Sequence, residues 1–357
     1  MTTLSKNKAV LGLSGGVDST TAALLLKEQG LEVIGFYFDV LGGSREGAEA
    51  AADLARQLDI PFVCRDVSDV FDKIVIDNFC GEYACGRTPN PCVVCNPAVK
   101  FRQLLEVADE QGAYYIATGH YARVARDESS GFSCICKGAN EKKDQSYMLY
   151  RLGQDVLSRL LLPLGGFEDK ERTRELARDH GLSNADASDS QEICFIDDQR
   201  ESYGEFLARR GVPAIEGNFV DKSGRILGRH KGISCYTIGQ RKGLGVALGK
   251  PAFVTRIDPV SGDVTLGDNE DLFQRQVLSK DNFFAETSGS SLPAAFSGSM
   301  AVSAKIRYAA KAAAAVVTKT SDGHLLTTFE EPQRAAAPGQ SIVFYDGDRV
   351  IGGGFID

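Results

Sequence analysis

Residues 10–20, VLGLSGGVDST, contain the pattern that decides the fold. An apolar run stops at Ser14, two glycines follow, and the chain then enters an Ala/Leu-rich segment. This order predicts a buried strand, a tight turn and a helix. Glycines let an anion approach backbone N–H groups, and the N-terminus of the helix adds its dipole, so the turn is predicted to hold a nucleotide phosphate. The residues that would line it are Ser14, Gly15, Gly16, Asp18 and Ser19.

Two common phosphate-binding loops do not fit this turn. No Gly-Lys-Ser/Thr follows the glycines, which excludes a Walker A loop. The glycine spacing is also not that of the G-x-G-x-x-G dinucleotide fingerprint. The alternative without a binding role is an ordinary glycine turn between a strand and a helix.

Short apolar runs alternate with helical patterns over residues 8–120. Strands are expected at 9–13, 32–38, 61–65 and 114–117, and helices at 20–29, 45–58 and 101–111. Strands that alternate with helices indicate an α/β fold, with a parallel sheet and helices on both faces. Ligands bind at the carboxyl ends of such strands, so the loops after Leu13, Phe38 and Ala117 should share one edge.

The composition is typical of a globular protein of the cytoplasm. The 357 residues are too many for one ordinary core, so two or three domains are expected. Hydrophobic residues make up 43% of the chain, and no stretch approaches the roughly 18 apolar residues that span a bilayer. The first residues, MTTLSKNK, do not resemble a signal peptide. Nine cysteines in such a chain favour catalytic or metal-binding thiols over a disulfide scaffold.

Three regions differ in composition, and we take them as domains. Residues 1–198 carry the α/β pattern, residues 199–273 are rich in glycine and basic side chains, and residues 274–357 are dominated by strand patterns. Hairpins with short turns in the last region predict a small β-barrel or sandwich. Although the net charge is −8, residues 222–250 hold seven Lys or Arg and no acid. This basic stretch is predicted to bind nucleic-acid phosphates, and the alternative is a solvated loop region.

Two further strings place cysteines among polar residues. Residues 86–101, GRTPNPCVVCNPAVKF, carry Cys92 and Cys95 as a C-x-x-C pair. The three prolines of this string should hold the pair in a loop, outside regular structure. Residues 189–196, DSQEICFI, carry Cys194.

The string SGGVDS at 14–19 resembles the PP-loop of the ATP-pyrophosphatase superfamily. Taken with the two cysteine strings, the chain resembles the tRNA-specific 2-thiouridylases of the MnmA type. The other strings that carry this resemblance are ATGHY at 117–121, KDQSYML at 143–149, KIRY at 305–308 and APGQ at 337–340. The resemblance implies an adenine nucleotide α-hydrolase-like catalytic domain, a central tRNA-binding domain and a C-terminal β-barrel.

The reaction that this resemblance implies is the ATP-dependent 2-thiolation of tRNA. ATP with Mg²⁺ adenylates the 2-position oxygen of the wobble uridine, pyrophosphate leaves, sulfur attacks, and AMP is released. The partners are then tRNA and either a sulfur donor protein or inorganic sulfide. Two other functions stay open. An amide-forming PP-loop synthetase would leave the cysteines unexplained, and a non-enzymatic iron–sulfur or RNA-binding protein would leave SGGVDS unexplained.

Matching motif positions assigns roles to individual residues by resemblance. Cys95 corresponds to the nucleophile and Cys194 to the residue that carries persulfide sulfur, while Asp18 is the candidate for arranging Mg²⁺ and pyrophosphate. The ATP-binding positions are Gly12, Leu13, Ser14, Gly15, Gly16, Val17, Asp18, Ser19, Phe38 and Gly119. The tRNA-contacting positions are Asn90, Pro91, Cys92, His120, Lys143, Asp144, Gln145, Arg307, Tyr308 and Gln340. For His120, Lys143–Gln145, Arg307, Tyr308 and Gln340, the alternative is an ordinary loop, turn or strand residue.

Cys92 is a departure from the family pattern, because many members have aspartate there. Three thiolates, from Cys92, Cys95 and Cys194, could hold three irons of a 4Fe–4S cluster and leave the fourth iron open for hydrosulfide. The resemblance to thiouridylases with such a trio favours this cluster. The alternative is a persulfide on Cys194, with Cys95 forming a disulfide as sulfur leaves. The C-x₄-C spacing of Cys80 and Cys85, without a clear fourth ligand, disfavours zinc. Packing is favoured for these two cysteines, and a second cysteine pair or an accessory sulfur relay are the alternatives.

Overall fold

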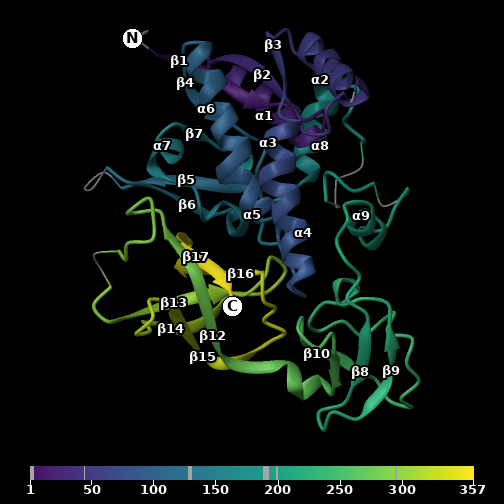
Figure 1. The fold of residues 1–357 in the computed structure, drawn as a ribbon. Helices are drawn as coiled ribbons and strands as arrows, with labels where there is room; N and C mark the ends of the chain where they lie inside the picture. Colours follow the sequence, from purple (N-terminus) through teal and green to yellow (C-terminus); the bar gives the residue numbers. More distant parts are fainter. Residues whose placement is uncertain (1–3, 44, 128–130, 188–192, 198–199, 294–295) are drawn as a thin grey trace.

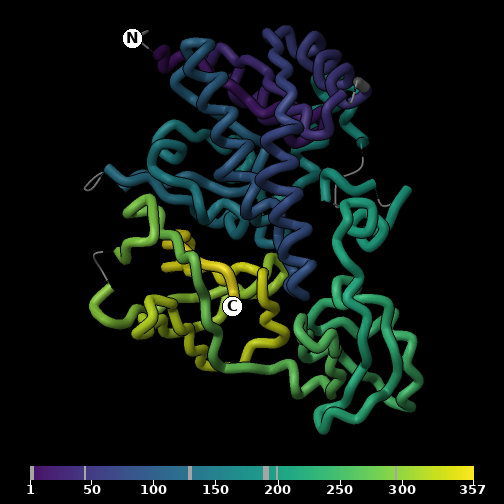
Figure 2. Tube along the Cα trace, in the orientation of Figure 1, coloured from purple at the N-terminus to yellow at the C-terminus, as the bar shows by residue number. Residues whose placement is uncertain are grey.

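The structure, a computed structural model, is organised in three parts that follow one another along the chain (Figure 1). It describes residues 4–43, 45–127, 131–187, 193–197, 200–293 and 296–357. An α/β domain leads into a small central sheet, and the chain then returns to a barrel whose last strands lie below the α/β domain (Figure 2). Over the described residues, no helix has the length and apolar character needed to cross a membrane.

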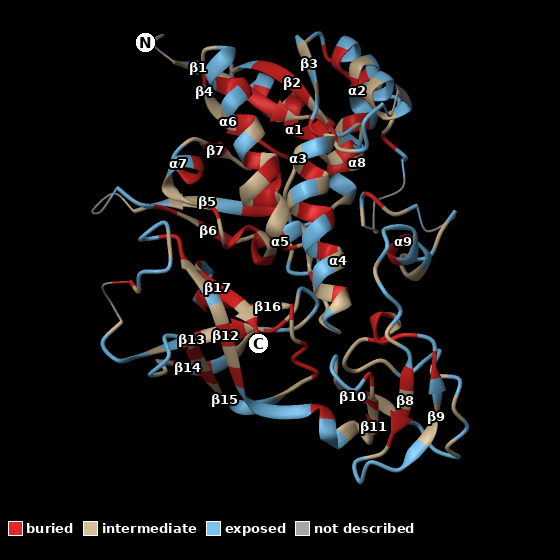
Figure 3. Ribbon diagram, in the orientation of Figure 1, coloured by how far each residue is buried: buried red, intermediate tan, exposed pale blue. Residues whose placement is uncertain are grey.

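The α/β domain is built on a five-stranded parallel sheet with the order β3-β2-β1-β4-β7. Its strands are β1 (Ser5–Gly12), β2 (Glu32–Asp39), β3 (Phe62–Asp66), β4 (Ala113–Ala117) and β7 (Leu160–Leu161). The four predicted strands and their parallel arrangement are confirmed, and β7 extends the sheet beside β4. Figure 3 shows that buried residues follow β2 through the middle of this sheet.

Helices cover both faces of the sheet, as the alternating pattern predicts. The side chains of a strand point alternately to its two faces. Val10 of β1 therefore joins a core with Leu104 of the helix α6 (Phe101–Glu110), while Leu11 joins a separate core with Leu26 of α1 (Val17–Glu28). The other predicted helix is α2 (Arg45–Gln57). The remaining helical segments of this part are α3 (Ser68–Phe71), η1 (Asp72–Ile76), α4 (Asp77–Ala84), η3 (Ser146–Leu149), α7 (Gln154–Leu157), η4 (Pro163–Gly166), α8 (Glu171–Asp179) and α9 (Tyr203–Arg209).

The prediction that prolines keep the C-x-x-C pair in a loop is wrong. Both cysteines lie on a short helix, α5 (Pro91–Cys95), which continues through a π-helical turn, η2 (Asn96–Lys100), into α6. Pro91 occupies the first helical turn, where a missing N–H costs nothing and a fixed φ is favourable. Asn90 caps the helix, because its side-chain oxygen accepts the N–H of Cys92 at 3.1 Å. The wide turn η2 accommodates Pro97.

The C-terminal part is a closed barrel, which decides between the barrel and the sandwich that the sequence left open. Its strand order is β12-β15-β14-β13-β16-β17, and pairing of β12 with β17 closes the ring. The strands are β12 (Phe273–Phe284), β13 (Ser299–Lys305), β14 (Ala313–Lys319), β15 (Leu325–Arg334), β16 (Ser341–Asp346) and β17 (Arg349–Ile356). β13 ends before Arg307 and Tyr308, which the sequence pattern had placed within a strand.

A hairpin from the α/β domain extends the barrel sheet. Its strands are β5 (Ala122–Arg126) and β6 (Ser133–Lys137), and β6 pairs antiparallel with β17. Buried hydrogen bonds hold the same interface, since the Tyr147 hydroxyl donates to the Ser341 carbonyl at 2.8 Å. The Tyr150 hydroxyl lies 3.2 Å from the hydroxyl of the same serine. The barrel is therefore fixed to the α/β domain both by sheet pairing and by tyrosine side chains.

The central part is a four-stranded sheet with the order β10-β11-β8-β9. Its strands are β8 (Gly217–Val220), β9 (Ile226–His230), β10 (Phe253–Ile257) and β11 (Val264–Gly267), with a short 3-10 turn η5 (Ile233–Cys235) and another, η6 (Asn269–Leu272), leading to the barrel. Its core gathers around Phe219, and the rings of His230 and Tyr236 lie 5.2 Å and 5.1 Å from it. These two rings are interior packing residues rather than surface aromatics.

Candidate active site

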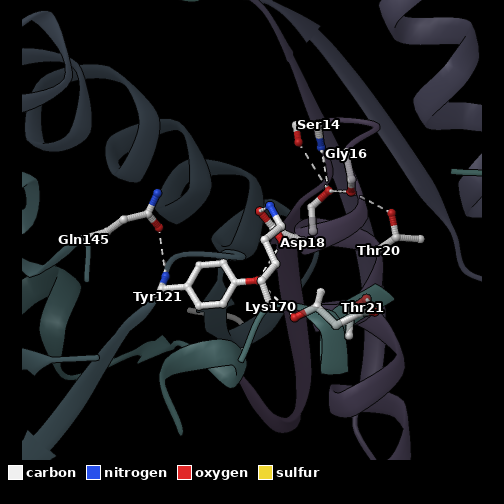
Figure 4. Close-up of polar contacts among 10 residues, drawn as sticks. Ser14, Gly16, Asp18, Thr20, Thr21, Tyr121, Gln145 and Lys170 are labelled. Atoms are coloured by element: carbon white, nitrogen blue, oxygen red, sulfur yellow. Dashed lines mark hydrogen bonds and ion pairs between the residues drawn. The ribbon is translucent and has the colours of Figure 1, made fainter. Parts of the chain in front are cut away.

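The predicted phosphate loop occupies the turn between β1 and α1 (Figure 4). Gly15 has a φ of +86°, a backbone conformation that residues other than glycine rarely adopt. The Ser19 hydroxyl donates to the Gly16 carbonyl at 2.9 Å and accepts the Ser14 N–H at 3.2 Å. The loop thus folds back on the start of α1, whose first N–H groups have no acceptor within the helix. Together they place backbone N–H groups where an anion can accept their hydrogen bonds.

The residues of other strands that are predicted to bind the nucleotide meet this loop at the carboxyl edge of the sheet. A Cβ atom on Gly12 would lie 3.1 Å from the ring of Phe38, at the end of β2. A Cβ atom on Gly119, just after β4, would lie 2.8 Å from the carbonyl carbon of Asp18. The 2.8 Å distance at position 119 is too short for the Cβ atom of any side chain, so glycine is required there. The loops after β1, β2 and β4 therefore share one edge, as the sequence predicts.

Asp18 is held by Tyr121, the last residue of the ATGHY string, and by Lys170, which no motif indicated (Figure 4). Its Oδ1 accepts the Tyr121 hydroxyl at 2.8 Å, and its Oδ2 lies 3.2 Å from the Lys170 Nζ. The Tyr121 hydroxyl also lies 3.0 Å from the hydroxyl of Thr173. The Asp18 side chain remains 33% exposed. One accessible carboxylate suits Mg²⁺, which proteins hold through one or two carboxylates together with substrate phosphates.

Asn184 is another residue of this site that no motif indicated. Its side-chain N–H₂ donates to the Gly15 carbonyl at 2.9 Å and to the Thr20 hydroxyl at 2.7 Å. Its Oδ1 is buried and makes no hydrogen bond with the residues that the structure describes. Asn184 thereby fixes the peptide after the first loop glycine. It also ties the phosphate loop to the chain segment that leads toward Cys194.

The three thiols Cys92, Cys95 and Cys194 lie close enough to influence one another's ionisation. Burial, followed by the neighbouring Cys95 and Cys92, raises the pKa of Cys194 to about 11. Burial also raises the pKa of Cys95, and the positive charge of Lys100 opposes the rise at both residues. The aromatic ring of Phe195 packs 5.2 Å from Phe79 of α4, which anchors the Cys194 segment beside α5. Residues 189–192 of that predicted string lie outside the described residues.

The thiols do not form a ready-made metal site. Among the residues that the structure describes, no three Cys, His, Asp or Glu side chains are grouped so that they could hold a metal ion. All nine cysteines are free thiols. Cys92 is exposed at the start of α5, whereas Cys95 is partly buried one turn later. The arrangement therefore presents neighbouring thiols rather than converging metal ligands.

Lys100 connects the thiols to the phosphate loop. Burial, followed by the charge of Lys100, lowers the pKa of His120 well below its ordinary value, so this imidazole is neutral at physiological pH. His120 follows Gly119, which touches Asp18, and its Nδ1 lies 2.7 Å from the Thr118 hydroxyl. The charge of Lys100 therefore acts both on His120, beside the phosphate loop, and on the thiols.

Several of the residues predicted to contact tRNA have structural partners within the protein. Asp144 is buried, and its carboxylate accepts the N–H groups of Gly138 and Ser146, both at 3.0 Å. The Gln145 side chain accepts the Tyr121 N–H at 2.8 Å. These contacts make the 144–145 turn a support for Tyr121, and hence for Asp18.

The barrel residues of this predicted set hold the start of the C-x-x-C helix. The Gln340 side chain donates to the Thr88 carbonyl at 2.9 Å, and the Thr88 N–H donates to the Pro338 carbonyl at 2.8 Å. The Arg307 guanidinium donates to the Arg334 carbonyl at 2.7 Å. Tyr308 is 37% exposed and lies near Cys92, so its ring keeps a surface that an RNA base could reach.

Three family models match successive parts of the chain. The tRNA methyl transferase HUP domain matches residues 7–198, the tRNA methyl transferase PRC-barrel domain matches residues 204–268, and the aminomethyltransferase beta-barrel domain matches residues 279–356. Curated relatives named tRNA-specific 2-thiouridylase MnmA match nearly the whole chain. The relative from Clostridium acetobutylicum is 47% identical and covers 98% of this chain and 99% of its own length. The relative from Clostridioides difficile is 44% identical and covers 98% of each.

Solved structures show more distant likenesses. The U34-tRNA thiolase NcsA from Methanococcus maripaludis with its 4Fe-4S cluster is 20% identical, covers 58% of this chain and 66% of its own, and has a TM-score of 0.34. NMN synthetase from Francisella tularensis is 15% identical, covers 57% of this chain and 76% of its own, and has a TM-score of 0.33. Likeness at this level does not define a shared activity.

The fold and the phosphate loop together define an ATP-using enzyme of the PP-loop class. Identity of 44–47% over almost the full length of the MnmA relatives then identifies the family. The chain belongs to the tRNA-specific 2-thiouridylases, and it is an enzyme that modifies tRNA.

The close contact at Gly119 leads to a first prediction. In Gly119→Ala, the new methyl group meets the Asp18 backbone at 2.8 Å, so β4 and α1 must move apart at the phosphate loop. We expect ATP binding, measured by calorimetry, to weaken by roughly tenfold or more, which corresponds to about 1.4 kcal/mol. Gly81→Ala is the control, because no atom lies within 4 Å of its added Cβ. Unchanged ATP binding in Gly119→Ala, with the fold intact by circular dichroism, would contradict the proposed nucleotide site.

Proposed function

We propose that this protein is an ATP-dependent tRNA-uridine 2-sulfurtransferase that converts the wobble uridine of tRNA to 2-thiouridine. The observation that carries the proposal is the proximity of two chemistries in one site. The glycine loop at Asp18 packs against Gly119, and the charge of Lys100 acts both on the adjacent His120 and on the thiol of Cys95. Relatives with nearly full-length similarity carry the name tRNA-specific 2-thiouridylase. With ATP and tRNA as substrates, we expect the reaction in the cytoplasm.

The first half-reaction uses the phosphate loop. The N–H groups of the loop and the start of α1 bind the β- and γ-phosphates, while Asp18 orients them with Mg²⁺, which supplies charge neutralisation when bound. Uridine O2 attacks the α-phosphorus, the bond to the pyrophosphate oxygen breaks, and pyrophosphate leaves. The Nζ of Lys170 lies 3.2 Å from the Asp18 carboxylate, so Lys170 can either keep this ion pair or contact a phosphate oxygen of ATP. The adenylated O2 is then a leaving group.

The second half-reaction uses the thiols. The sequence favours a 4Fe–4S cluster on Cys92, Cys95 and Cys194, but the described side chains are not grouped as metal ligands. We therefore propose the persulfide route. The terminal sulfur of a Cys194 persulfide attacks C2, and AMP leaves with the former O2. The Cys95 thiolate then attacks the Cys194 sulfur and breaks the S–S bond. This releases 2-thiouridine and forms a Cys95–Cys194 disulfide, which a thiol reductant reduces with two electrons.

The experiment that tests the function measures AMP, pyrophosphate and 2-thiouridine with unmodified tRNA and a sulfur source. We expect AMP formation to require tRNA. Cys95→Ser and Cys194→Ser should lose thiolation while retaining adenylation, and Asp18→Asn should lose both. Cys64→Ser, an exposed cysteine on β3, is the matched control and should behave as wild type. AMP formation that ignores tRNA would instead indicate an amide-forming or other PP-loop enzyme.

Iron and sulfide analysis after anaerobic purification tests the sulfur route. We expect iron-free protein that thiolates tRNA with a persulfide-generating partner, together with a Cys95–Cys194 disulfide after a single turnover without reductant. About four irons per chain, lost in Cys92→Ser with loss of activity, would overturn the persulfide route and make Cys92 a cluster ligand.

The basic stretch at 222–250 divides into paired and unpaired charges. Lys222, Arg225 and Lys250 form ion pairs with Asp271, Asp221 and Asp268 at 2.5, 3.1 and 2.6 Å, and Arg229 reaches Glu216 at 3.8 Å. Lys231, Arg241 and Lys242 form no ion pair with the described residues. We propose that these three residues, rather than the whole stretch, contribute phosphate contacts to tRNA.

Two triple variants of equal charge test this assignment. The first replaces Lys231, Arg241 and Lys242 with Gln, and the second replaces Lys222, Arg225 and Lys250 with Gln. Each phosphate contact contributes about 0.7–0.9 to the slope of log affinity against log salt. In filter-binding measurements, we expect the magnitude of this slope to fall by roughly 2–3 in the first variant and to change little in the second. Equal losses would show that only the net charge matters.

A further inference from the structure

Two cysteines that the proposed reaction does not use face each other on β6. Cys134 and Cys136 are two residues apart on this strand, so both side chains lie on the same face. Their sulfur atoms are 4.0 Å apart, within hydrogen-bonding contact. Cys136 is buried, whereas Cys134 is partly exposed. The pair therefore has one accessible thiol and one protected thiol.

The neighbouring strands place arginines beside this pair. The β5–β6 register sets Arg123 opposite Cys136, and the β6–β17 register sets Arg349 opposite the same residue. Arg123 is engaged with Asp348 at 2.9 Å. Arg349 makes no ion pair with the residues that the structure describes, which leaves its charge available to the sulfur atoms. An arginine beside a cysteine favours the thiolate form of that cysteine.

A half-open cavity gives small molecules access to Cys134. Its volume is about 510 Å³, and it lies between the β5–β6 hairpin and the barrel. Phe132, Met300 and Ile351 supply apolar walls, while Cys134 and Arg349 supply a nucleophile and a cation. The carboxylate residues Asp127, Glu286 and Asp346 also line the cavity. The cavity thus brings solvent-borne reagents to one sulfur of the pair.

The ionisation of the two thiols is consistent with this geometry. The hydrogen bond with Cys136 lowers the pKa of Cys134, with Arg349 contributing, while burial and Asp127 act in the opposite direction. The same hydrogen bond and burial raise the pKa of Cys136. Of the two thiols, Cys134 is therefore the more readily ionised.

We propose that Cys134 and Cys136 form a peroxide-sensitive dithiol, distinct from the thiols of the thiolation site, that closes reversibly to a disulfide. The Cys134 thiolate attacks one oxygen of hydrogen peroxide and the O–O bond breaks. Cys134 becomes a sulfenic acid, and the other oxygen leaves as hydroxide and takes up a proton to form water. The Cys136 sulfur then attacks the sulfenic sulfur, an S–S bond forms, and the hydroxyl leaves as water with the thiol proton.

Closing this bridge requires β6 to bend locally. Residues i and i+2 of a strand are about 6.6 Å apart, which is within the usual 4.4–6.8 Å between the Cα atoms of bridged cysteines, but their parallel Cβ atoms must approach to about 3.5–4.5 Å. A bridge that bends the strand in this way is readily reduced by small thiols. β6 is also the strand through which the α/β domain joins the barrel, by pairing with β17. Oxidation is thereby placed at the seam between the two domains.

Differential alkylation and mass spectrometry test the proposal on the full-length protein. Trypsin releases residues 127–137, which contain Cys134 and Cys136 and no other cysteine, and residues 57–65, which contain only Cys64. Cys64 is the internal control, because it is exposed but its pKa is raised by burial and by Asp39 and Asp66. With limiting hydrogen peroxide, we expect the 127–137 peptide to lose two hydrogens roughly tenfold or more faster than Cys64 is oxidised. Dithiothreitol should restore both thiols.

Three variants locate the chemistry. Cys136→Ser should trap a sulfenic acid that dimedone labels at position 134, whereas Cys134→Ser should leave Cys136 unlabelled and tRNA thiolation unchanged. Arg349→Gln should slow the oxidation severalfold without preventing the bridge. Oxidation of the 127–137 peptide no faster than that of Cys64 would overturn the proposal. Labelling of Cys136 in Cys134→Ser would also overturn it. Because tRNA thiolation is read separately, failure of the dithiol and failure of the proposed function are distinguishable.

Discussion

The backbone contact between Gly119 and Asp18 is the constraint on which the rest of the site depends. A side chain at position 119 would overlap the start of α1, so β4 and α1 meet at a distance that only glycine allows. This contact brings the end of β4 against the phosphate loop at the end of β1. It also sets the residues that follow Gly119 beside Asp18, including Tyr121, whose hydroxyl binds the carboxylate at 2.8 Å. The nucleotide loop and the path toward the thiols therefore share one point of close packing.

The barrel contributes to the same site, although it follows the α/β domain by many residues in the sequence. Gln340 and Pro338 hold both backbone polar groups of Thr88, just before the Asn90 cap of α5. A helix as short as α5 gains little stability from its own hydrogen bonds. Its position is therefore set by its cap, by the continuing helix and by the barrel. The sulfur chemistry proposed for Cys95 thus depends on the docking of a separate domain.

Patterns that are local in sequence were predictable, and contacts between distant segments were not. Strands β1 to β4 and the helices α1, α2 and α6 follow from apolar periodicity and glycine position. The helical C-x-x-C pair was missed because prolines were read as breakers, although an Asn cap before Pro91 favours a helix start. Lys170 and Asn184 carry no motif, since their importance lies in reaching Asp18 and Gly15 from far along the chain. The pairing of β6 with β17 was beyond local reasoning for the same reason.

The cysteines show how far residue type alone falls short of chemical role. Cys64 lies near Asp39 and Asp66, Cys194 lies beside other thiols in partly buried surroundings, and Cys134 lies beside a thiol donor and an arginine. These surroundings raise the pKa of Cys64 and Cys194 and lower that of Cys134, because the thiolate is favoured only where hydrogen bonds and positive charge outweigh burial. Each set of neighbours is assembled from separate strands or helices. The chemistry of a thiol in this protein is therefore a property of strand register and domain docking, and it can be assigned only once those are known.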